Sequence, residues 1–322
     1  MLTNLARRQI SVNSNPANSN SATTIDHKKW PLVSVIIPVF NRESTITRAI
    51  ASVQRQTYKN IQILVIDDGS SDATVDVVRR LTERDQRVTL LRHSSNQGRS
   101  AARNTGVRVA SGVLVAFLDS DDEWLPEKLQ CQVKAWLDTT DREHAVVYCA
   151  YRLLLPHYRR KTLPKHVIKR AQRVATYLFC DGGFMQTSGL VLPIDLARTA
   201  PFPVGLEQYE DYALLFELER LNAHFICVKQ ALVDIHWEEQ GTRKDGWTCN
   251  RAIEFYNNWS SHFSHEAADC FKFENTVLAA LRYGKKFRAV MIQASVIRWQ
   301  SLHIYHFGAL AKWLFVRLGH IK

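Results

Sequence analysis

The first half of the chain alternates continuous apolar runs with segments in which apolar residues recur at helical spacing. The runs are rich in Val, Ile and Leu, as is typical of strands that are covered on both faces of a parallel sheet. They cover residues 33–40, 61–68, 88–93 and 112–121. The segments between them that predict helices cover residues 44–56, 72–83 and 98–110. This alternation predicts right-handed crossovers and a doubly wound α/β fold with a mostly parallel sheet flanked by helices.

The second half of the chain is less regular. Residues 145–155 are predicted to form a further strand, and residues 187–192 and 225–228 are predicted to form shorter ones. Residues 209–221 have the spacing of an amphipathic helix with an acidic first turn, which the positive end of a helix dipole favours. Residues 1–30 are rich in Ser and Asn where the sequence reads SVNSNPANSNSATT, and they predict a disordered polar tail.

Positive charge is concentrated in two parts of the chain. The formal net charge is +11, from 42 basic and 31 acidic residues. Residues 271–322 hold nine Lys or Arg against Glu274 alone, a net charge of +8, and residues 151–175 hold eight basic residues and no acidic one. A basic surface attracts phosphate on a nucleic acid, a lipid head group or a nucleotide, so charge alone does not choose among these partners.

The cysteines and the hydropathy limit the compartment. The six cysteines are scattered and none forms a CxxC pair, which disfavours a disulfide framework or a zinc site and favours reduced thiols in the cytosol. The first residues lack the apolar core of a secretory signal. No apolar run approaches the roughly 20 residues that span a bilayer, so any membrane contact is expected to be peripheral.

Polar side chains follow three of the predicted strands at the point where each one ends. Asn41 and Arg42 follow the first, Asp67 and Asp68 end the second, and residues 119–122 end the fourth. Ligands of doubly wound sheets bind at the carboxyl ends of the strands. Carboxylates that meet there repel one another unless a cation or a ligand is present, so we expect a binding site at this edge.

The sharpest local signal is the Asp-x-Asp formed by Asp119 and Asp121. Carboxylates at the end of a strand suit Mg²⁺ or Mn²⁺, which proteins bind through one or two carboxylates together with substrate phosphates. The structural alternative is a turn or a helix cap. It fits Asp122 well, because Pro126 is expected to begin the next helix.

Two helix starts add weaker signals. Gly98, Arg99 and Arg103 open one predicted helix, and both helix N-termini and guanidinium groups favour phosphate. Glu210 and Asp211 open another, where a favourable interaction with the helix dipole would account for them on its own.

Five segments in this order resemble glycosyltransferase family 2, which has the GT-A fold. They read VSVIIPVFNRE, VIDDGSSDAT, GRSAARNTGVRVASG, FLDSDD and EDYALLFEL, and the resemblance covers roughly residues 31–235. It implies an inverting glycosyltransferase, of hexosyltransferase type, that uses a nucleotide-sugar. The nucleotide-sugar contacts that it implies are Pro38, Phe40, Asn41, Glu43, Asp67, Asp68, Arg103, Asp119 and Ser120.

The same resemblance implies the residues that do the chemistry. Asp121 would bind the divalent cation, Mg²⁺ or Mn²⁺, and Asp211, following Glu210, would be the catalytic base. Family members often carry an Arg-x-His near the diphosphate, whereas Asp234 stands in place of the Arg here; His236 is therefore either a metal or diphosphate ligand or an ordinary loop histidine. Trp237 is expected to pack in the core or at its rim, with sugar stacking as the alternative.

These residue types fit one reaction mechanism. A cation stabilises the charge that grows on the departing nucleoside diphosphate, and a carboxylate removes the proton of the acceptor hydroxyl. One displacement with one base inverts the anomeric carbon. UDP is the favoured carrier because it is common in the family.

We expect three parts: the tail at 1–30, a GT-A catalytic domain at 31–260, and a basic, aromatic-rich helical extension at 261–322. The extension interleaves its charges with aromatic residues such as Trp299 and Trp313, which predicts docking on the anionic inner face of the cell membrane, near a glycan or lipid-linked acceptor used in surface polysaccharide synthesis. The alternative is a set of helices that pack on the catalytic domain.

Two other classes compete with this interpretation. A nucleic-acid-binding protein would explain the net charge, but carboxylates at three strand ends would repel a phosphate backbone, so no nucleic-acid partner is expected. A metal-dependent nucleotidyltransferase also uses Asp-x-Asp, but it would usually carry a Gly-rich phosphate loop and a Lys where residues 38–43 offer neither.

Overall fold

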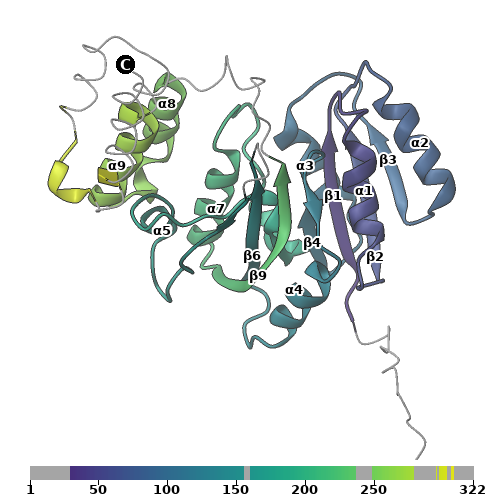
Figure 1. Ribbon diagram of the computed structural model, residues 1–322, viewed down its shortest axis with the longest axis horizontal. Coiled ribbons are helices and arrows are strands. Elements are labelled where there is room, and N and C mark those ends of the chain that lie inside the picture. Colours follow the sequence, from purple (N-terminus) through teal and green to yellow (C-terminus); the bar gives the residue numbers. More distant parts are fainter. Residues whose placement is uncertain are drawn as a thin grey trace, which may run out of the picture.

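A computed structural model describes residues 30–155, 160–236, 249–278, 295, 297–302 and 306–307. They form an α/β structure in which helices cover both faces of one sheet (Figure 1). The expected fold class is thereby confirmed. The predicted tail at 1–30 lies outside the described residues except for Trp30, as do Trp237 and most of 279–322.

The sheet has the strand order β3-β2-β1-β4-β8-β6-β9-β5, and β7 pairs with β6. β1, β2, β3 and β4 are parallel, β8 is antiparallel to both β4 and β6, and β6 is parallel to β9. β6 therefore runs in the same direction as β4, and most of the paired length is parallel. The strands are β1 (Val33–Val39), β2 (Ile61–Asp67), β3 (Val88–Arg92), β4 (Leu114–Phe117), β5 (Glu123–Trp124), β6 (Ala145–Leu154), β7 (Arg160–Leu163), β8 (Val191–Pro193) and β9 (His224–His236).

The helices that were predicted from apolar spacing are present, with bounds a few residues tighter. The helices are α1 (Ile46–Gln54), α2 (Thr74–Arg84), α3 (Arg99–Val109), α4 (Lys128–Leu137), α5 (Val174–Phe179), α6 (Ile194–Thr199), α7 (Glu210–Arg220), α8 (Cys249–Trp259) and α9 (His265–Lys272). A π-helical segment, Phe273–Leu278, follows α9 directly.

Two predicted strands differ from those observed. β9 is about three times as long as the expected 225–228, because its pairing with β6 skips the exposed Lys229 and Gln230 in a bulge and resumes at Ala231. The expected strand at 187–192 is instead a 3₁₀ turn over Thr187–Gly189 followed by the short β8.

The central strands bury side chains on both faces, which explains their continuous apolar sequences. Along β1, Ile36 joins the core that α3, α6 and α7 cover, whereas Val35 and Ile37 join the core under α1 and α4. Close packing of α3 on β1 depends on Gly106. A Cβ atom built there would lie 2.5 Å from Cγ2 of Ile36.

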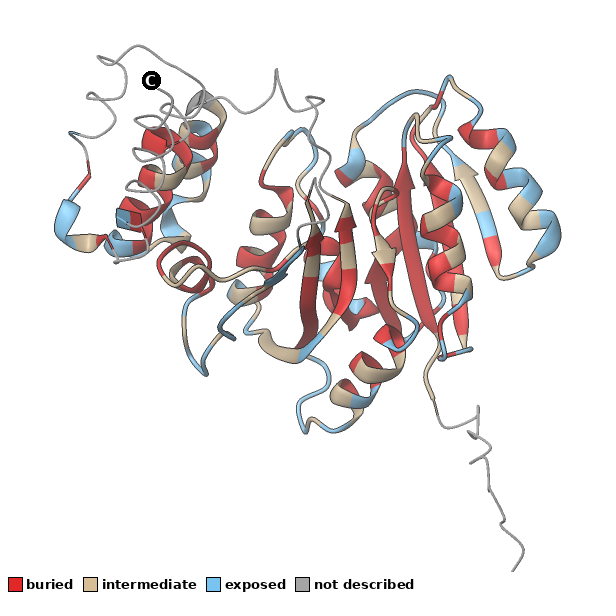
Figure 2. Ribbon diagram, viewed as in Figure 1, coloured by how far each residue is buried: buried red, intermediate tan, exposed pale blue. Residues whose placement is uncertain are grey.

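The C-terminal helices continue the first of these cores. Phe255 of α8 and Phe271 of α9 are buried in the same cluster as Phe216 of α7 and Phe179 of α5. Figure 1 shows α8 and α9 beside α5, and Figure 2 shows buried residues along α7, α8 and α9. Among the described residues, no helix combines the length and the apolar character needed to cross a membrane.

Candidate active site

The predicted carboxylates meet at one edge of the sheet because β1, β2 and β4 are parallel and end side by side. Asp67 is the last residue of β2, Asn41 lies two residues beyond β1, and Asp119 lies two beyond β4. Pro38, which the resemblance implies as a nucleotide-sugar contact, lies within β1 and pairs with Ile66 of β2. Pro is tolerated there because β4 on the other side has ended, so no ladder partner loses a donor.

The loops after β1 and β2 hold one another. The Asn41 amide donates to Ser70 Oγ at 2.9 Å, and the Ser71 amide donates to Asn41 Oδ1 at 2.9 Å. The Ala73 amide, which precedes α2, donates to Glu43 Oε2 at 2.9 Å. Asn41 has a positive φ of 50°, a conformation that Asn tolerates better than most residues. The side chains of Asn41 and Glu43 thus build this edge of the site, and the exposed Phe40 lies at its surface.

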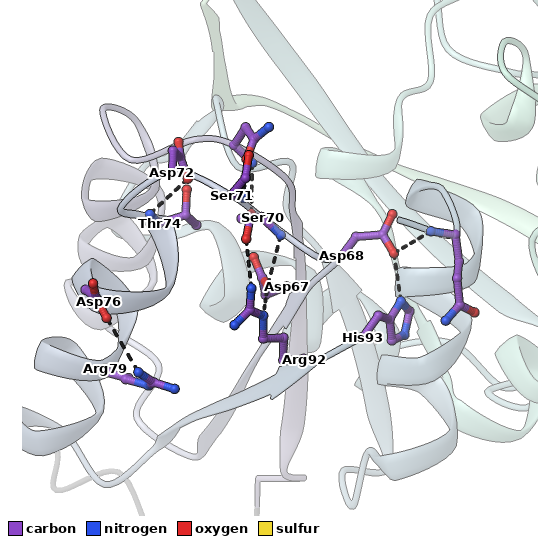
Figure 3. Close-up of polar contacts among 12 residues, drawn as sticks. Asp67, Asp68, Ser70, Ser71, Asp72, Thr74, Asp76, Arg79, Arg92 and His93 are labelled. Atoms are coloured by element: carbon purple, nitrogen blue, oxygen red, sulfur yellow. Dashed lines mark hydrogen bonds and ion pairs between the residues drawn. The ribbon is translucent and has the colours of Figure 1, made fainter. Parts of the chain in front are cut away.

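Asp67 is a buried carboxylate, and only one of its two oxygens has a hydrogen-bond partner among the described residues. Its Oδ2 lies 3.1 Å from Arg92 Nε and accepts from the Ser70 amide at 3.2 Å (Figure 3). Its Oδ1 is also buried and finds no hydrogen-bond partner within the described part of the chain. A buried polar atom without a partner costs free energy, so Oδ1 is suited to accept a hydrogen bond from a ligand.

Asp68 points to the other side of the strand end and is engaged by the protein itself (Figure 3). Its Oδ1 lies 2.7 Å from His93 Nδ1 and accepts from the Gln97 amide at 2.9 Å, while Oδ2 accepts from the Gly98 amide at 2.7 Å. His93 Nε2 in turn lies 3.0 Å from Thr105 Oγ1 on α3. Asp68 therefore fixes the loop that leads into α3.

Arg103 joins two of the predicted motifs. Its side chain is 1% exposed, and its guanidinium lies 2.6 Å from Asp119 Oδ1 and 3.3 Å from Glu210 Oε1. Arg99, one turn earlier on α3, lies 3.1 Å from the same Glu210 oxygen. Burial opposes the charged guanidinium, but the charges of Asp119 and Glu210 outweigh it and raise the pKa of Arg103. A permanently charged arginine thus ties the Asp-x-Asp turn to the start of α7.

Asp211 has the acid–base properties expected of a general base. It is the second residue of α7, and its Oδ1 accepts from the Tyr212 amide at 2.9 Å. Burial and the neighbouring charge of Glu210 raise the pKa of Asp211 to about 7. A base with a pKa near the operating pH is best placed to remove a proton. Glu210 is instead held by the two arginines of α3.

At the Asp-x-Asp turn, the carboxylate of Asp121 is exposed, whereas that of the following residue, Asp122, is buried. The Asp121 side chain is 45% exposed. Asp122 is buried and accepts from Ser188 Oγ at 2.6 Å, so it is not the helix cap that the sequence predicted: α4 begins at Lys128 and not at Pro126, and Glu127 precedes it as N-cap. Burial and the charges of Asp119 and Asp121 raise the pKa of Asp122 well above its ordinary value. Ser188 Oγ also accepts from the Asp119 amide at 3.1 Å, so Ser188 holds this turn, in which Ser120 is buried.

Two arginines that sequence reasoning did not single out approach Asp121. Arg48 of α1 donates to the Asp121 carbonyl at 2.6 Å, and Arg42 Nε lies 3.9 Å from Asp121 Oδ2. For Arg42 the sequence indicates only a place at this edge, after β1. Arg48 lies one helical turn inside α1, where a basic residue resembles any solvated surface position.

His236 ends β9 close to this turn. Its Nε2 lies 3.7 Å from Glu123 Oε2 and has no hydrogen-bond partner among the described residues. Burial and the charge of Arg48 lower the pKa of His236, which favours the neutral imidazole that a metal requires. Asp234, which stands where the family pattern has an Arg, accepts two hydrogen bonds from Arg152 of β6 at 2.5 and 2.6 Å.

The residues present fit a divalent cation that takes further ligands from its substrate. In the described ranges, no three His, Cys, Asp or Glu side chains gather into a complete metal site. One exposed carboxylate with a second nearby is nevertheless the donor set that proteins offer to Mg²⁺ when phosphates complete the coordination.

Comparison with known proteins agrees with this geometry. The sequence profile of the family described as "Glycosyl transferase family 2" matches residues 34–185. The amylovoran biosynthesis glycosyltransferase AmsB of Erwinia amylovora is 26% identical over 261 residues, which cover 80% of this chain and 87% of the relative. The UDP-Glc:alpha-D-GlcNAc-diphosphoundecaprenol beta-1,3-glucosyltransferase WfgD of Escherichia coli is 35% identical over 210 residues, which cover 62% of this chain and 77% of the relative.

Two solved structures share the fold. Residues 1–349 of TarS from S. aureus superpose with a TM-score of 0.58 at 20% identity, covering 82% of this chain and 77% of that TarS fragment. The mannosyltransferase PcManGT from Pyrobaculum calidifontis, in complex with GDP-Man and Mn²⁺, superposes with a TM-score of 0.58 at 20% identity, covering 90% of this chain and 88% of the neighbour. At these identities the likeness shows the GT-A fold alone.

Proposed function

The chain belongs to glycosyltransferase family 2, and from that premise we propose that it moves a sugar from a UDP-sugar to a hydroxyl of a lipid-linked glycan, with inversion at the anomeric carbon. The observation that carries this proposal is the buried Arg103, which holds the Asp-x-Asp turn and the Glu210–Asp211 pair at one edge of the sheet. Donor-side and base-side groups are thus brought together, as a single displacement requires.

The nucleotide is assigned to the ends of β1 and β2. Asp67 Oδ1 is the buried acceptor without a partner, and it would take a hydrogen bond from an N–H of the base. Asp68 would act indirectly, by fixing the loop before α3. The choice of UDP over GDP rests on the relative WfgD, whose name specifies UDP-Glc; PcManGT was solved with GDP-Man.

The cation is assigned to Asp121, with Asp119 and His236 beside it. When bound, it would supply positive charge to the departing diphosphate. Arg48 and Arg42 keep the Asp121 turn in place, and Arg103 holds Asp119 from behind. PcManGT, a structure of the same fold, is described with Mn²⁺.

The base is assigned to Asp211. Its carboxylate would accept the proton of the acceptor hydroxyl as that oxygen attacks the anomeric carbon, while the nucleoside diphosphate leaves on the other side. Glu210 keeps the charge of Arg103 and Arg99 balanced and helps to raise the pKa of Asp211.

The acceptor is proposed to be lipid-linked, and the enzyme to work at the inner face of a membrane. WfgD acts on a diphosphoundecaprenol-linked sugar according to its name, and AmsB is named for polysaccharide biosynthesis. Within the extension, the described residues 261–278 pack on the catalytic core, which agrees with the packing alternative for that part. Ile297 and Leu302 belong to the same core, so the membrane contact is assigned to the remaining residues of 279–322, a segment that holds eight basic residues and no acidic one.

Thermal unfolding with a panel of nucleotide-sugars, with and without Mn²⁺, tests the donor and the cation together. A ligand that binds only the folded state at 100 times its Kd adds about 3 kcal/mol, which raises the Tm of a chain of this size by several degrees. We expect a UDP-sugar to do so only with Mn²⁺, and Asp121→Asn to lose the response. The matched control is Asp76→Asn, another exposed carboxylate beside an arginine, on α2. An unchanged Mn²⁺ response in Asp121→Asn would overturn the metal assignment.

A further inference from the structure

The residue just before the proposed catalytic pair has an unusual backbone. Tyr209 has φ 67° and ψ 15°, the left-handed region that residues with a Cβ rarely adopt, and α7 begins at the next residue. Such a conformation persists only where the surroundings hold it in place. Whatever fixes Tyr209 therefore also fixes the direction in which α7 leaves the site.

The C-terminal helices hold Tyr209. Its side chain is 5% exposed, and its hydroxyl donates to Asn275 Oδ1 at 3.2 Å. Its ring centroid lies 4.9 Å from that of Phe255 on α8 and 5.7 Å from that of Phe271 on α9. The ring is thus enclosed by residues more than 40 positions later in the chain.

Asn275 is itself fixed by its own helix. Its Nδ2 donates to the Phe271 carbonyl at 3.1 Å, and its side chain is 8% exposed. It lies in the π-helical segment Phe273–Leu278, a type of turn that occurs in proteins frequently at functional sites. An α-helical continuation of α9 would place residue 275 on a different face.

We propose that the segment 249–278 positions the catalytic base, with Asn275 acting through Tyr209 on the first turn of α7. This inference rests on the proposed role of Asp211 as the base. Asn275 and Tyr209 are positioning residues: they hold the backbone from which the Asp211 carboxylate reaches the acceptor. The segment 249–278 thus contributes to the geometry of the active site.

The contact between Tyr209 and Asn275 also affects how far water reaches Asp211. The charged groups that face Asp211 are Glu210 on its own helix and Arg103 and Arg99 on α3. If the first turn of α7 loosens, water reaches Asp211 and relieves the burial that raises its pKa. The pH at which the base gains its charge then falls, and the carboxylate no longer points at a fixed place.

The test compares Tyr209→Phe, Asn275→Leu and the double variant in the full-length chain. We expect kcat to fall about tenfold in each, since small misplacements of a reacting group are costly, while the KM for the donor stays within about twofold. The double variant should lose no more than either single one, because one link is broken in all three. The acidic limb of the kcat profile should move to lower pH.

The control is Tyr58→Phe, which removes a buried hydroxyl that donates to the Pro31 carbonyl, remote from α7. It should lose stability as Tyr209→Phe does but keep the wild-type kcat and pH profile. If Asn275→Leu fails to fold, Tyr209→Phe, which loses one oxygen atom, decides the question. Wild-type kcat and pH profile in Tyr209→Phe, with Asp211→Asn inactive, would overturn the positioning role alone. Full turnover in Asp211→Asn would instead overturn the base assignment.

Discussion

The buried side chain of Lys128 allows a test of how much burial of a charged group costs in free energy of unfolding. Lys128 is the first residue of α4 and fully buried, and its Nζ has no hydrogen-bond partner among the described residues. The ammonium lies 3.8 Å from the ring centroid of Trp124, whose indole donates to the Ser188 carbonyl at 2.8 Å. Burial lowers the pKa of Lys128 from 10.5 to about 7.

The sign of the pH dependence follows from the direction of this shift. Between pH about 7 and 10.5 the unfolded chain holds a proton at Lys128 that the folded chain lacks, so the free energy of unfolding rises with pH across that window. Below pH about 7 both states are protonated, and the full cost of a buried charge remains. At about 1.4 kcal/mol per pH unit that cost is about 5 kcal/mol, and the cation–π contact offsets roughly 1–2 kcal/mol of it.

Lys128→Met should therefore stabilise the protein by roughly 3 kcal/mol at pH 6, and its advantage should shrink as the pH rises toward 10. Met keeps the length of the side chain and its packing on Trp124. Urea unfolding of both proteins at pH 6, 7.5 and 9 measures the difference. Lys134→Met, at an exposed position on the same helix, should show no such pH-dependent gain. A Met variant that is less stable at pH 6, or whose advantage does not narrow with pH, would refute the reasoning.

The remaining predictions concern the site. Asp211→Asn should keep donor affinity and lose turnover by about 100-fold, the range of a lost general base; an equal loss of donor affinity would make it a binding residue instead. In the wild type, kcat/KM should rise with pH through about 7, because only the deprotonated Asp211 accepts a proton, and a flat profile from pH 5.5 to 8 would contradict this. Arg103→Met should cost about 3–5 kcal/mol in urea unfolding, since it leaves Glu210 buried with less opposing charge, and a cost near zero would mean that the pair is solvated. NMR of the product linkage should show inversion; retention would contradict a single displacement with one base.

The fold and the main motifs of the catalytic domain follow from the sequence because their signals are local. Continuous apolar runs identify the central strands, and helical spacing identifies α1 and α2 between them. The ends of those strands then place Asp67 and Asp119 on one edge without any knowledge of contacts. Burial on both faces of a parallel sheet is what makes this inference reliable.

The parts that depend on distant pairings were not predictable in the same way. Arg103 sits on a helix that looks basic and solvated in sequence, and only the packing of α3 shows its guanidinium buried between Asp119 and Glu210. Arg152 pairs with Asp234 on the neighbouring strand, a contact between residues 82 positions apart that no linear motif can reveal. The role of Asn275 depends on a hydrogen bond to a residue 66 positions earlier.

The contact between Gly106 and Ile36 sets the height of α3 above the sheet. A methyl group at residue 106 would need roughly 1 Å more room to reach ordinary van der Waals separation, and the branched Ile36 side chain turns aside poorly. Arg103 lies three residues earlier on the same helix, so lifting the helix would draw its guanidinium away from Asp119, which it contacts at 2.6 Å. In a mutational screen, Gly106→Ala would then score as an active-site lesion, although glycine has no side chain to touch a substrate. Such a screen would detect the steric clash between an added methyl group at residue 106 and Ile36.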